Sequence, residues 1–321
     1  MNPRARHASA LVVLAVSTVF SGGSFVLAKA SVLAQLPFAT GESTWFIAAH
    51  NLAPRFAIGV LVLLALYRGR VLQLTRPEWN QAVFMAVASF AGCMLQTDGL
   101  QRTSAATTAF LTQFYVILVP LWWALMQRRR PSWSMLVPAM LVLAGVAVLA
   151  RVDWHTFRIG RGELEILLAT GFFSLLLCSL NWPAFATNRA PRTSAGMFLI
   201  ETGLFAALSV ATCRAPAHLF TPYASPGWLG IVVVVAVLGT TGPFVVNNHW
   251  QRFITPPEAG LIYSFSPVVA ALMEVILPAS LASWTGIAYA NQPLTAVLVT
   301  GGALILGANV LIQLWPQKQK A

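Results

Sequence analysis

The sequence predicts an all-α integral membrane protein with ten transmembrane helices, built as two inverted five-helix repeats. Three observations predict this class. Ten apolar stretches fill almost the whole chain of 321 residues, and their lengths cluster near the ~20 residues that a helix needs to cross ~30 Å of hydrocarbon. Hydrophobic residues make up 57% of the chain and charged residues 9%, too few to solvate the surface of a soluble domain. The third observation is an internal repeat.

The first apolar stretch follows Arg4 and Arg6 and runs from Ala8 to Ala28. The apolar core of a signal peptide is usually only 7–15 residues long, so we expect a retained first helix. Short loops, most of them basic, separate the later helices. One long apolar region has no such loop, and we divide it into two spans near Gln101-Arg102. In chain order, the expected spans are 8–30, 44–67, 79–99, 103–126, 133–151, 163–187, 194–213, 227–249, 255–277 and 294–315.

The basic residues of these loops predict the orientation of the chain. If the N-terminus is cytoplasmic, thirteen of the twenty basic residues lie in cytoplasmic segments, six lie on the opposite side, and Arg55 lies within a span. This bias follows the positive-inside rule. We therefore expect a multi-pass protein of the cytoplasmic (inner) membrane with both termini in the cytoplasm. The net charge of +11 then reflects topology and lipid headgroups, and we expect no nucleic-acid partner.

An internal repeat divides the chain into two halves. Gln101-Arg102 recurs 150 residues later as Gln251-Arg252. At the same offset, Ala109 corresponds to Ala259 and Leu111 to Leu261. We expect an N-terminal repeat over residues 1–151, a connecting loop over 152–162 and a C-terminal repeat over 163–321. Because each half holds an odd number of helices, the halves have opposite orientation, an architecture that recurs in secondary transporters.

Motifs in both halves resemble a known family. The first helix reads Phe20-Ser21-Gly22-Gly23-Ser24-Phe25-Val26-Leu27-Ala28-Lys29, and the second contains Pro54-Arg55-Phe56. Later motifs are Ala109-Phe110-Leu111, Ala259-Gly260-Leu261-Ile262-Tyr263 and Gly301-Gly302-Ala303-Leu304-Ile305-Leu306-Gly307. In their order and spacing, these motifs are similar to the EamA-type family of the drug/metabolite transporter superfamily. The resemblance implies ten helices in two halves, cytoplasmic termini and transport of a small organic metabolite, often outward.

Polar residues within the spans are candidates for a binding site, because an ionisable group at mid-bilayer normally faces a cavity or a partner. Asn51 and Arg55 are four residues apart and share a helix face. Arg55 can anchor a substrate carboxylate or phosphate, or form an ion pair with Asp98 or Glu201. Glu201 can carry a coupling proton, pair with Arg55 or reach toward an interface. Five further residues can orient a substrate or bridge helices: Gln113, Tyr115, Asn181, Trp182 and Tyr263.

The sequence lacks the motifs of several other kinds of site. The chain has no CxxC or Cys/His cluster, and its three cysteines lie in or beside apolar segments, so we expect no metal, cofactor or disulfide framework. It carries no GxxxxGK[ST] motif and no HExxH motif. We therefore expect a secondary transporter rather than an enzyme, with a small-molecule substrate, the lipid bilayer as partner, alternating access and efflux. The substrate can be an amino acid, a nucleobase-like compound or a drug-like solute. The alternatives are a membrane-embedded enzyme acting on a lipid or peptide and a non-transporting subunit.

Overall fold

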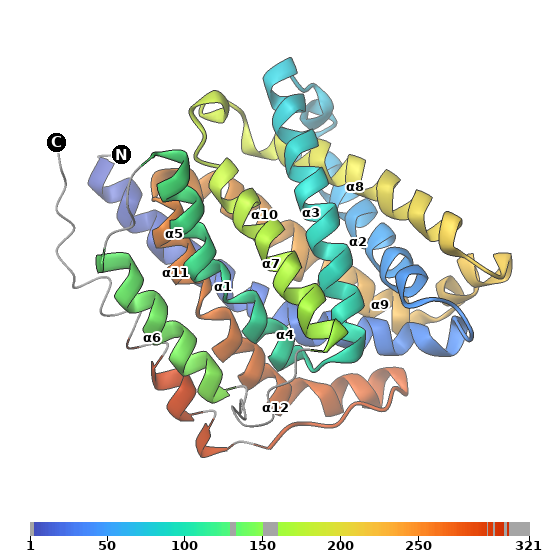
Figure 1. The fold of residues 1–321 in the computed structure, drawn as a ribbon. Helices are drawn as coiled ribbons and strands as arrows, with labels where there is room; N and C mark the ends of the chain where they lie inside the picture. Colours follow the sequence, from blue (N-terminus) through green and yellow to red (C-terminus); the bar gives the residue numbers. More distant parts are fainter. Residues whose placement is uncertain are drawn as a thin grey trace.

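Helices make up the regular structure of the computed structural model (Figure 1). The structure describes residues 3–128, 133–149, 160–293, 295–297, 299–304 and 307. Within this part of the chain there is no strand. The predicted all-α class is therefore confirmed.

Three long helices open the chain: α1 (Pro3–Gln35), α2 (Thr44–Tyr67) and α3 (Arg76–Arg102). The Ser43 hydroxyl caps α2 by accepting from the Phe46 N–H at 3.1 Å. At the start of α3, Thr75 and Glu78 form a capping box that satisfies otherwise free N–H groups. One-turn 3₁₀ helices at Leu36–Phe38 and Arg70–Leu72 lie in the two connections.

The fourth predicted span is a broken helix. It consists of α4 (Ala105–Thr112) and α5 (Tyr115–Met126), with Gln113 and Phe114 between them. The division expected near Gln101-Arg102 is present, because α3 ends at Arg102 and Ser104 caps α4. The fifth predicted span is occupied by α6 (Trp133–Leu149), which has 17 residues.

The second half is more interrupted. After α7 (Arg161–Ser179) and α8 (Ala190–Thr212), the eighth predicted span consists of α9 (Pro226–Val234), a π-helical segment (Val235–Thr241) and α10 (Gly242–Trp250). The ninth span is broken between α11 (Pro256–Tyr263) and α12 (Ser266–Thr285). Short 3₁₀ helices cover Pro183–Phe185, Pro216–Leu219, Thr221–Ala224 and Gln251–Phe253.

Eight helices of the described part, counting each interrupted span as one, are long and apolar enough to cross a membrane. They correspond to eight of the predicted spans. The tenth, 294–315, lies largely outside the described residues, so the total of ten stays a prediction. The sixth was predicted too long: α7 ends at Ser179 rather than at residue 187. Pro183 explains this end, because the residue before a proline is pushed out of the helical region, and Trp182 is extended with ψ 133°.

Helices from the two halves interleave (Figure 1). In the middle, α2 packs against α8. Beside them, α3 of the first half packs along α7 of the second. In the corresponding contact, α1 packs along α9, the π-helical segment and α10. The contact of α1 with α12 corresponds in the same way to the contact of α7 with α5. The contact of α4 with α12 corresponds to that of α11 with α5. Apart from α2–α8, each of these contacts therefore occurs twice, with the roles of the halves reversed.

Small residues permit the close approaches between helices. A Cβ atom added to Gly22 would lie 2.6 Å from the Val269 Cβ and 2.7 Å from the Ser266 carbonyl oxygen of α12. A Cβ atom on Gly99 of α3 would lie 2.7 Å from the Gly162 carbonyl oxygen of α7. These contacts bring backbones together where any side chain would separate them.

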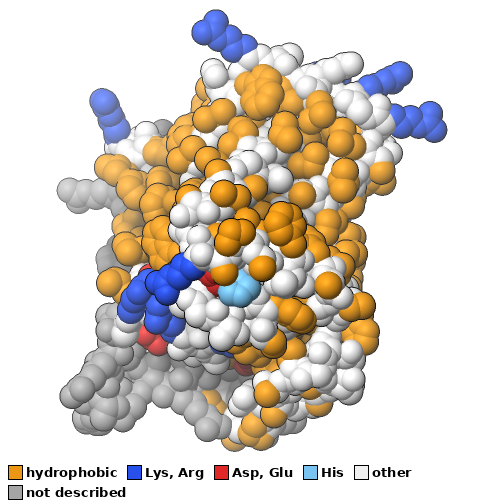
Figure 2. All heavy atoms as spheres, turned by 90° about the vertical axis from the view of Figure 1, so that its right-hand side faces the viewer, with side chains coloured by type: hydrophobic (Ala, Val, Ile, Leu, Met, Phe, Trp, Pro, Cys, Tyr) orange, Lys and Arg blue, Asp and Glu red, His pale blue; other side chains and the backbone are white. Residues whose placement is uncertain are grey.

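Apolar side chains also cover the outside of the bundle. Figure 2 shows them spread over one face, with basic side chains at its upper edge and one mixed charged patch lower down. Exposed apolar residues include Val12, Leu61, Leu66 and Ile276. Such a surface would be costly in water but fits a lipid environment.

Candidate functional site

A cavity of about 200 Å³ lies between the two halves, near the middle of the helices. Side chains of α1, α2, α3, α7 and α10 line it, together with the breaks between α4 and α5 and between α11 and α12. Its polar residues outside the predicted set include Ser21, Ser24, Gln96, Asn247, Asn248 and Gln251. Mostly apolar walls with a few convergent polar groups are typical of a small-molecule site.

Arg55 is the cation of this cavity. Its Nε atom donates a hydrogen bond to the Thr240 hydroxyl in the π-helical segment. The Thr240 hydroxyl in turn donates to the Val235 carbonyl oxygen at 3.1 Å. A π-helical turn inserts an extra residue and is frequent at functional sites; here it presents Thr240 to Arg55. Within the described residues, no carboxylate lies within ion-pairing distance of Arg55.

Glu201 lies behind this cavity rather than on its wall. It is completely buried on α8, and neither carboxylate oxygen makes a hydrogen bond of normal geometry within the described structure. The Ser89 hydroxyl and the Arg55 guanidinium are close enough to interact with it electrostatically. Asp98, the other partner considered for Arg55, instead accepts from Arg161 at 2.8 Å. Arg55 and Glu201 therefore share a buried region without forming a direct ion pair.

Gln113, Tyr115 and Tyr263 lie at the two helix breaks and line the cavity, as expected for residues near mid-span. The Tyr263 hydroxyl donates to Gln251 Oε1 at 3.2 Å. Gln113 donates from Nε2 to the Ala109 carbonyl oxygen at 3.2 Å, and its Oε1 atom is buried without a partner. An unsatisfied buried acceptor is costly, so Gln113 offers a free acceptor to a ligand.

Asn51 does not reach the cavity. Its side chain accepts from the Ser31 hydroxyl at 3.0 Å and donates to Gln35 Oε1 at 3.2 Å. Gln35 also contacts the His50 ring at 3.2 Å. Asn51 therefore ties α2 to α1, although it shares a helix face with Arg55.

Asn181 and Trp182 also lie outside the cavity lining, beyond the end of α7. Asn181 donates to the Ile254 carbonyl oxygen at 2.9 Å. In the first half, Lys29 makes the matching contact, since its Nζ atom donates to the Thr103 and Leu100 carbonyl oxygens at 2.9 and 2.6 Å. Both side chains thus satisfy carbonyl groups where the chain leaves a helix.

Trp182 packs among aromatic rings, with centroid distances of 4.8 Å to Phe84 and 5.6 Å to Phe185. Its indole N–H has no hydrogen-bond partner in the described structure.

Sequence reasoning missed part of the cavity wall. Asn247, Asn248 and Gln96 were not among the predicted site residues, but all three line the cavity. Asn248 donates to the Ser194 hydroxyl at 2.6 Å and keeps a buried, unpartnered Oδ1 atom. The available signal was the presence of amides in an apolar stretch.

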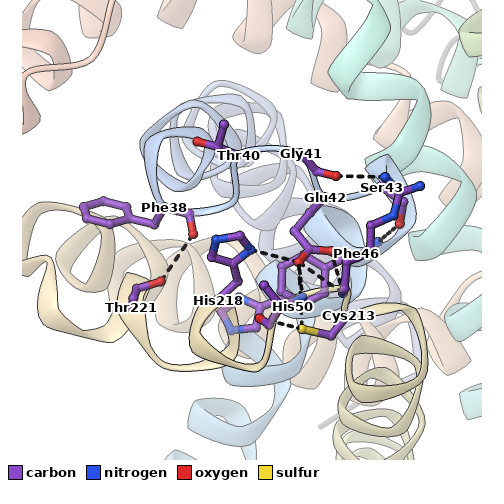
Figure 3. Close-up of polar contacts among 12 residues, drawn as sticks. Phe38, Thr40, Gly41, Glu42, Ser43, Phe46, His50, Cys213, His218 and Thr221 are labelled. Atoms are coloured by element: carbon purple, nitrogen blue, oxygen red, sulfur yellow. Dashed lines mark hydrogen bonds and ion pairs between the residues drawn. The ribbon is translucent and has the colours of Figure 1, made fainter.

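One polar contact joins the halves on the face to which α1 leads, which we call the distal face (Figure 3). The Glu42 carboxylate accepts from the backbone N–H groups of Arg214 and Ala215 at 3.0–3.1 Å and from His218 Nδ1 at 2.8 Å. Its side chain is 1% exposed. Arg214 donates to the Gly41 carbonyl oxygen at 3.0 Å. We call these interactions the distal contact.

The charge state of Glu42 follows from its donors. Burial would raise the pKa of Glu42, but the hydrogen bonds from His218, Ala215 and Arg214 outweigh this effect, so the pKa lies below its ordinary value. The carboxylate is therefore ionised at neutral pH. An ionised carboxylate with three or more donors is a strong link between the loop before α2 and the loop after α8.

A second carboxylate joins the halves on the opposite, proximal face, where α1 begins. Glu78 of α3 is 3% exposed and accepts from the Arg189 backbone N–H at 3.2 Å. Its carboxylate also lies 3.6 Å from Arg192 Nη1. Asn188 donates to the Pro77 carbonyl oxygen at 3.1 Å. We call this set the proximal contact. Each face thus has a buried glutamate that binds a loop of the other half.

Metal binding finds no support in the described part of the chain, because no group of three or more His, Cys, Asp or Glu side chains is suitably placed there. Cys93 and Cys178 are free and belong to different regions of the interior. Cys93 lines the cavity.

Comparison with known proteins shows which family the N-terminal part of the chain resembles. Residues 8–151 match the EamA-like transporter family. A protein from Archaeoglobus fulgidus described as an uncharacterized transporter is 22% identical over 304 residues, which cover 94% of this chain and 84% of that protein. A solved crystal structure has a TM-score of 0.70 at 18% identity and covers 98% of this chain and 99% of its own. The predicted resemblance to the EamA family is therefore confirmed, and the last match supports the fold.

Proposed function

We propose that this EamA-type membrane protein is a secondary transporter that moves a small organic solute across the cytoplasmic membrane by alternating access, in the direction of efflux. The observation that carries the proposal is the mid-membrane cavity between the two halves, with Arg55 on its wall. Substrate sites of secondary transporters lie near the midplane at the interface between repeats and are formed by discontinuous helices.

The inverted-repeat arrangement is part of this proposal. The breaks at Gln113-Phe114 and Ser264-Phe265 are about 150 residues apart, the offset of the sequence repeat. The exchanged helix pairs described above support two units over residues 1–151 and 163–321. A pseudo-twofold axis in the membrane plane would generate both features, with α2 and α8 packed beside it and both termini in the cytoplasm.

The cavity favours a solute with an anionic or acceptor group and an apolar body. The guanidinium of Arg55 uses Nε for Thr240, which leaves its terminal nitrogens for a carboxylate or phosphate. Gln113 Oε1 and Asn248 Oδ1 are buried without partners and can accept from donors of the same solute. Tyr115, Phe173 and Phe244 supply apolar and aromatic walls. An amino acid, a nucleobase-like compound and a drug-like acid all satisfy these requirements.

Alternating access requires the two faces to open in turn. The distal and proximal contacts hold loops of opposite halves together on the two faces. Both are formed in this structure, as expected for a state between the inward-open and outward-open conformers. We propose that the distal contact is the outer gate, that the proximal contact is the inner gate, and that one breaks in each half-cycle.

Glu201 is the candidate for proton coupling. A buried carboxylate without a hydrogen-bond partner costs much less when it is protonated. Its electrostatic interaction with Arg55 links that proton to substrate binding. Transport driven by a proton gradient would use this link, whereas exchange of substrates would not need it.

A counterflow screen in proteoliposomes tests the proposal. Vesicles loaded with unlabelled members of one metabolite class are mixed with labelled solute, with and without an imposed pH difference. We expect transient accumulation of at least one carboxylate- or phosphate-bearing solute, and its loss in Arg55→Ala. Chemical conversion of a lipid or peptide without solute movement would contradict the proposal and favour an enzyme.

A further inference from the structure

A second, basic pocket lies at the proximal face, away from the central cavity. It has a volume of about 430 Å³ and opens between the end of α2 and the start of α8. Four arginines surround it: Arg68 and Arg70 from the first half, and Arg189 and Arg192 from the second. We call it the arginine pocket.

Most of the positive charge in this pocket is uncompensated. Arg192 donates to the Gln73 carbonyl oxygen at 2.5 Å and lies 3.6 Å from Glu78. By contrast, the guanidinium groups of Arg68, Arg70 and Arg189 make no hydrogen bond or ion pair with any residue that the structure describes. Three free guanidinium groups around one hollow, beside the positive end of the long helix α8, attract an anion strongly.

The surroundings of the pocket indicate where that anion comes from. Leu66 and Tyr67 form the last turn of the membrane-spanning helix α2 and line the pocket, with 70% and 41% of their surfaces exposed. An exposed leucine followed by a tyrosine is the pattern of a helix that leaves the hydrocarbon and enters the headgroup layer. The arginines follow directly, so they lie at the depth of lipid phosphates.

We propose that the arginine pocket binds the phosphate of an anionic phospholipid headgroup, whose acyl chains lie along the apolar surface beside Leu66. Guanidinium groups bind phosphate oxygens in pairs, and basic pockets between helices on a cytoplasmic face are suited to such headgroups. A free phosphate shares this chemistry but makes no use of the apolar wall. The inference depends on the membrane-spanning fold and not on transport.

Lipid retention by the purified protein tests the inference directly. Delipidated protein is incubated with phosphatidylglycerol, cardiolipin or phosphatidylcholine, and the bound lipid is measured by native mass spectrometry. We expect phosphatidylglycerol and cardiolipin to be retained in preference to phosphatidylcholine. The triple variant R68Q/R70Q/R189Q should lose this preference, with affinity for the anionic lipids falling about 10–100-fold.

A charge-matched control separates the pocket from general basicity. The variant R6Q/R76Q/R128Q also removes three positive charges, but these exposed arginines do not line the pocket. It should retain the anionic lipids as the wild type does. Equal losses in both triple variants, or wild-type retention in R68Q/R70Q/R189Q, would overturn the inference. Displacement of the lipid by millimolar inorganic phosphate, together with equal retention of all three lipids, would identify free phosphate as the ligand and also overturn it.

Discussion

The Nδ1 atom of His218 lies 2.8 Å from Glu42 Oε1 and thereby joins the loop before α2 to the segment after α8. The contact joins the two halves of the chain, because Glu42 and His218 are 176 positions apart in the sequence. Backbone N–H groups of Arg214 and Ala215 complete the set of donors.

The variant Glu42→Gln should weaken this link. It replaces a buried acceptor of charge-assisted hydrogen bonds by a neutral amide, and we expect the free energy of unfolding to fall by about 1–3 kcal/mol. Thermal unfolding of the purified protein measures the change. Glu163→Gln serves as the control, because Glu163 lies in the first turn of α7 and is only partly buried. A control variant as unstable as Glu42→Gln would refute the assignment.

The pH dependence of this effect has a definite sign. Since the pKa of Glu42 lies below its ordinary value, its stabilising effect is complete above the ordinary carboxyl pKa of ~4.3 and disappears as the pH falls through the lowered value. The difference in unfolding temperature between wild type and Glu42→Gln should therefore be constant from about pH 8 to 5 and vanish only below about pH 4. A difference that changes between pH 8 and 5 would contradict the assignment of this stabilisation to the Glu42 carboxylate.

Arg55→Ala should lower transport strongly without preventing membrane insertion. The variant removes the cation of the cavity and leaves Thr240 without its donor. A lost charge-assisted hydrogen bond to the substrate corresponds to about a 10–100-fold loss of affinity. Counterflow rates measure it, and size-exclusion chromatography checks the fold. Arg55→Lys keeps the charge but not the planar fork and should retain an intermediate rate. Wild-type rates in Arg55→Ala would remove Arg55 from the site.

Glu201→Gln distinguishes proton coupling from exchange. The amide is nearly isosteric with a protonated carboxyl group, so the completely buried position tolerates it. We expect counterflow to persist while acceleration by an imposed pH difference is lost. If the pH difference still drives solute movement in the variant, the coupling proton is carried elsewhere.

Helix packing gives a prediction that is independent of transport. In Gly22→Ala the new methyl group would lie 2.6–2.7 Å from Val269 and Ser266, so α1 and α12 must separate. We expect a loss of about 1–3 kcal/mol in the free energy of unfolding. The matched control is Gly171→Ala, because a Cβ atom on Gly171 meets nothing within 4 Å. Similar unfolding temperatures for the two variants would contradict the close approach.

Much of the fold was predictable because hydropathy and length alone report membrane spans. The start and end of α2 agree with the predicted span 44–67. The breaks at Gln113 and Ser264 and the π-helical segment were not predicted. No glycine or charge run marks the two breaks, and Gly239 in the π-helical segment does not by itself distinguish it from a regular helix. These features depend on contacts between helices from opposite halves, such as that between Arg55 and Thr240.

The candidate site was predictable in part for a related reason. A charged residue in a span has few stable environments, and Arg55, a predicted site residue, lines the cavity. Its role in binding stays a prediction. A buried amide side chain is stable either when it hydrogen-bonds to a neighbouring helix or when it faces the cavity. Asn51 and Asn181 satisfy neighbouring helices, whereas Asn248 reaches the cavity. The sequence does not separate these cases, because which face of a helix meets the cavity is set by packing.

The central claim is that the two halves open the cavity to one face at a time, and the reactivity of Cys93 tests it most directly. Cys93 lines the cavity, and a background with Cys178→Ala and Cys213→Ala leaves it as the single thiol. A membrane-impermeant maleimide is added to intact cells or to inverted vesicles. The account predicts that Glu42→Gln speeds labelling in cells and that Glu78→Gln speeds it only in inverted vesicles. Acceleration by either variant from both faces at once, or unchanged labelling in both, would contradict it.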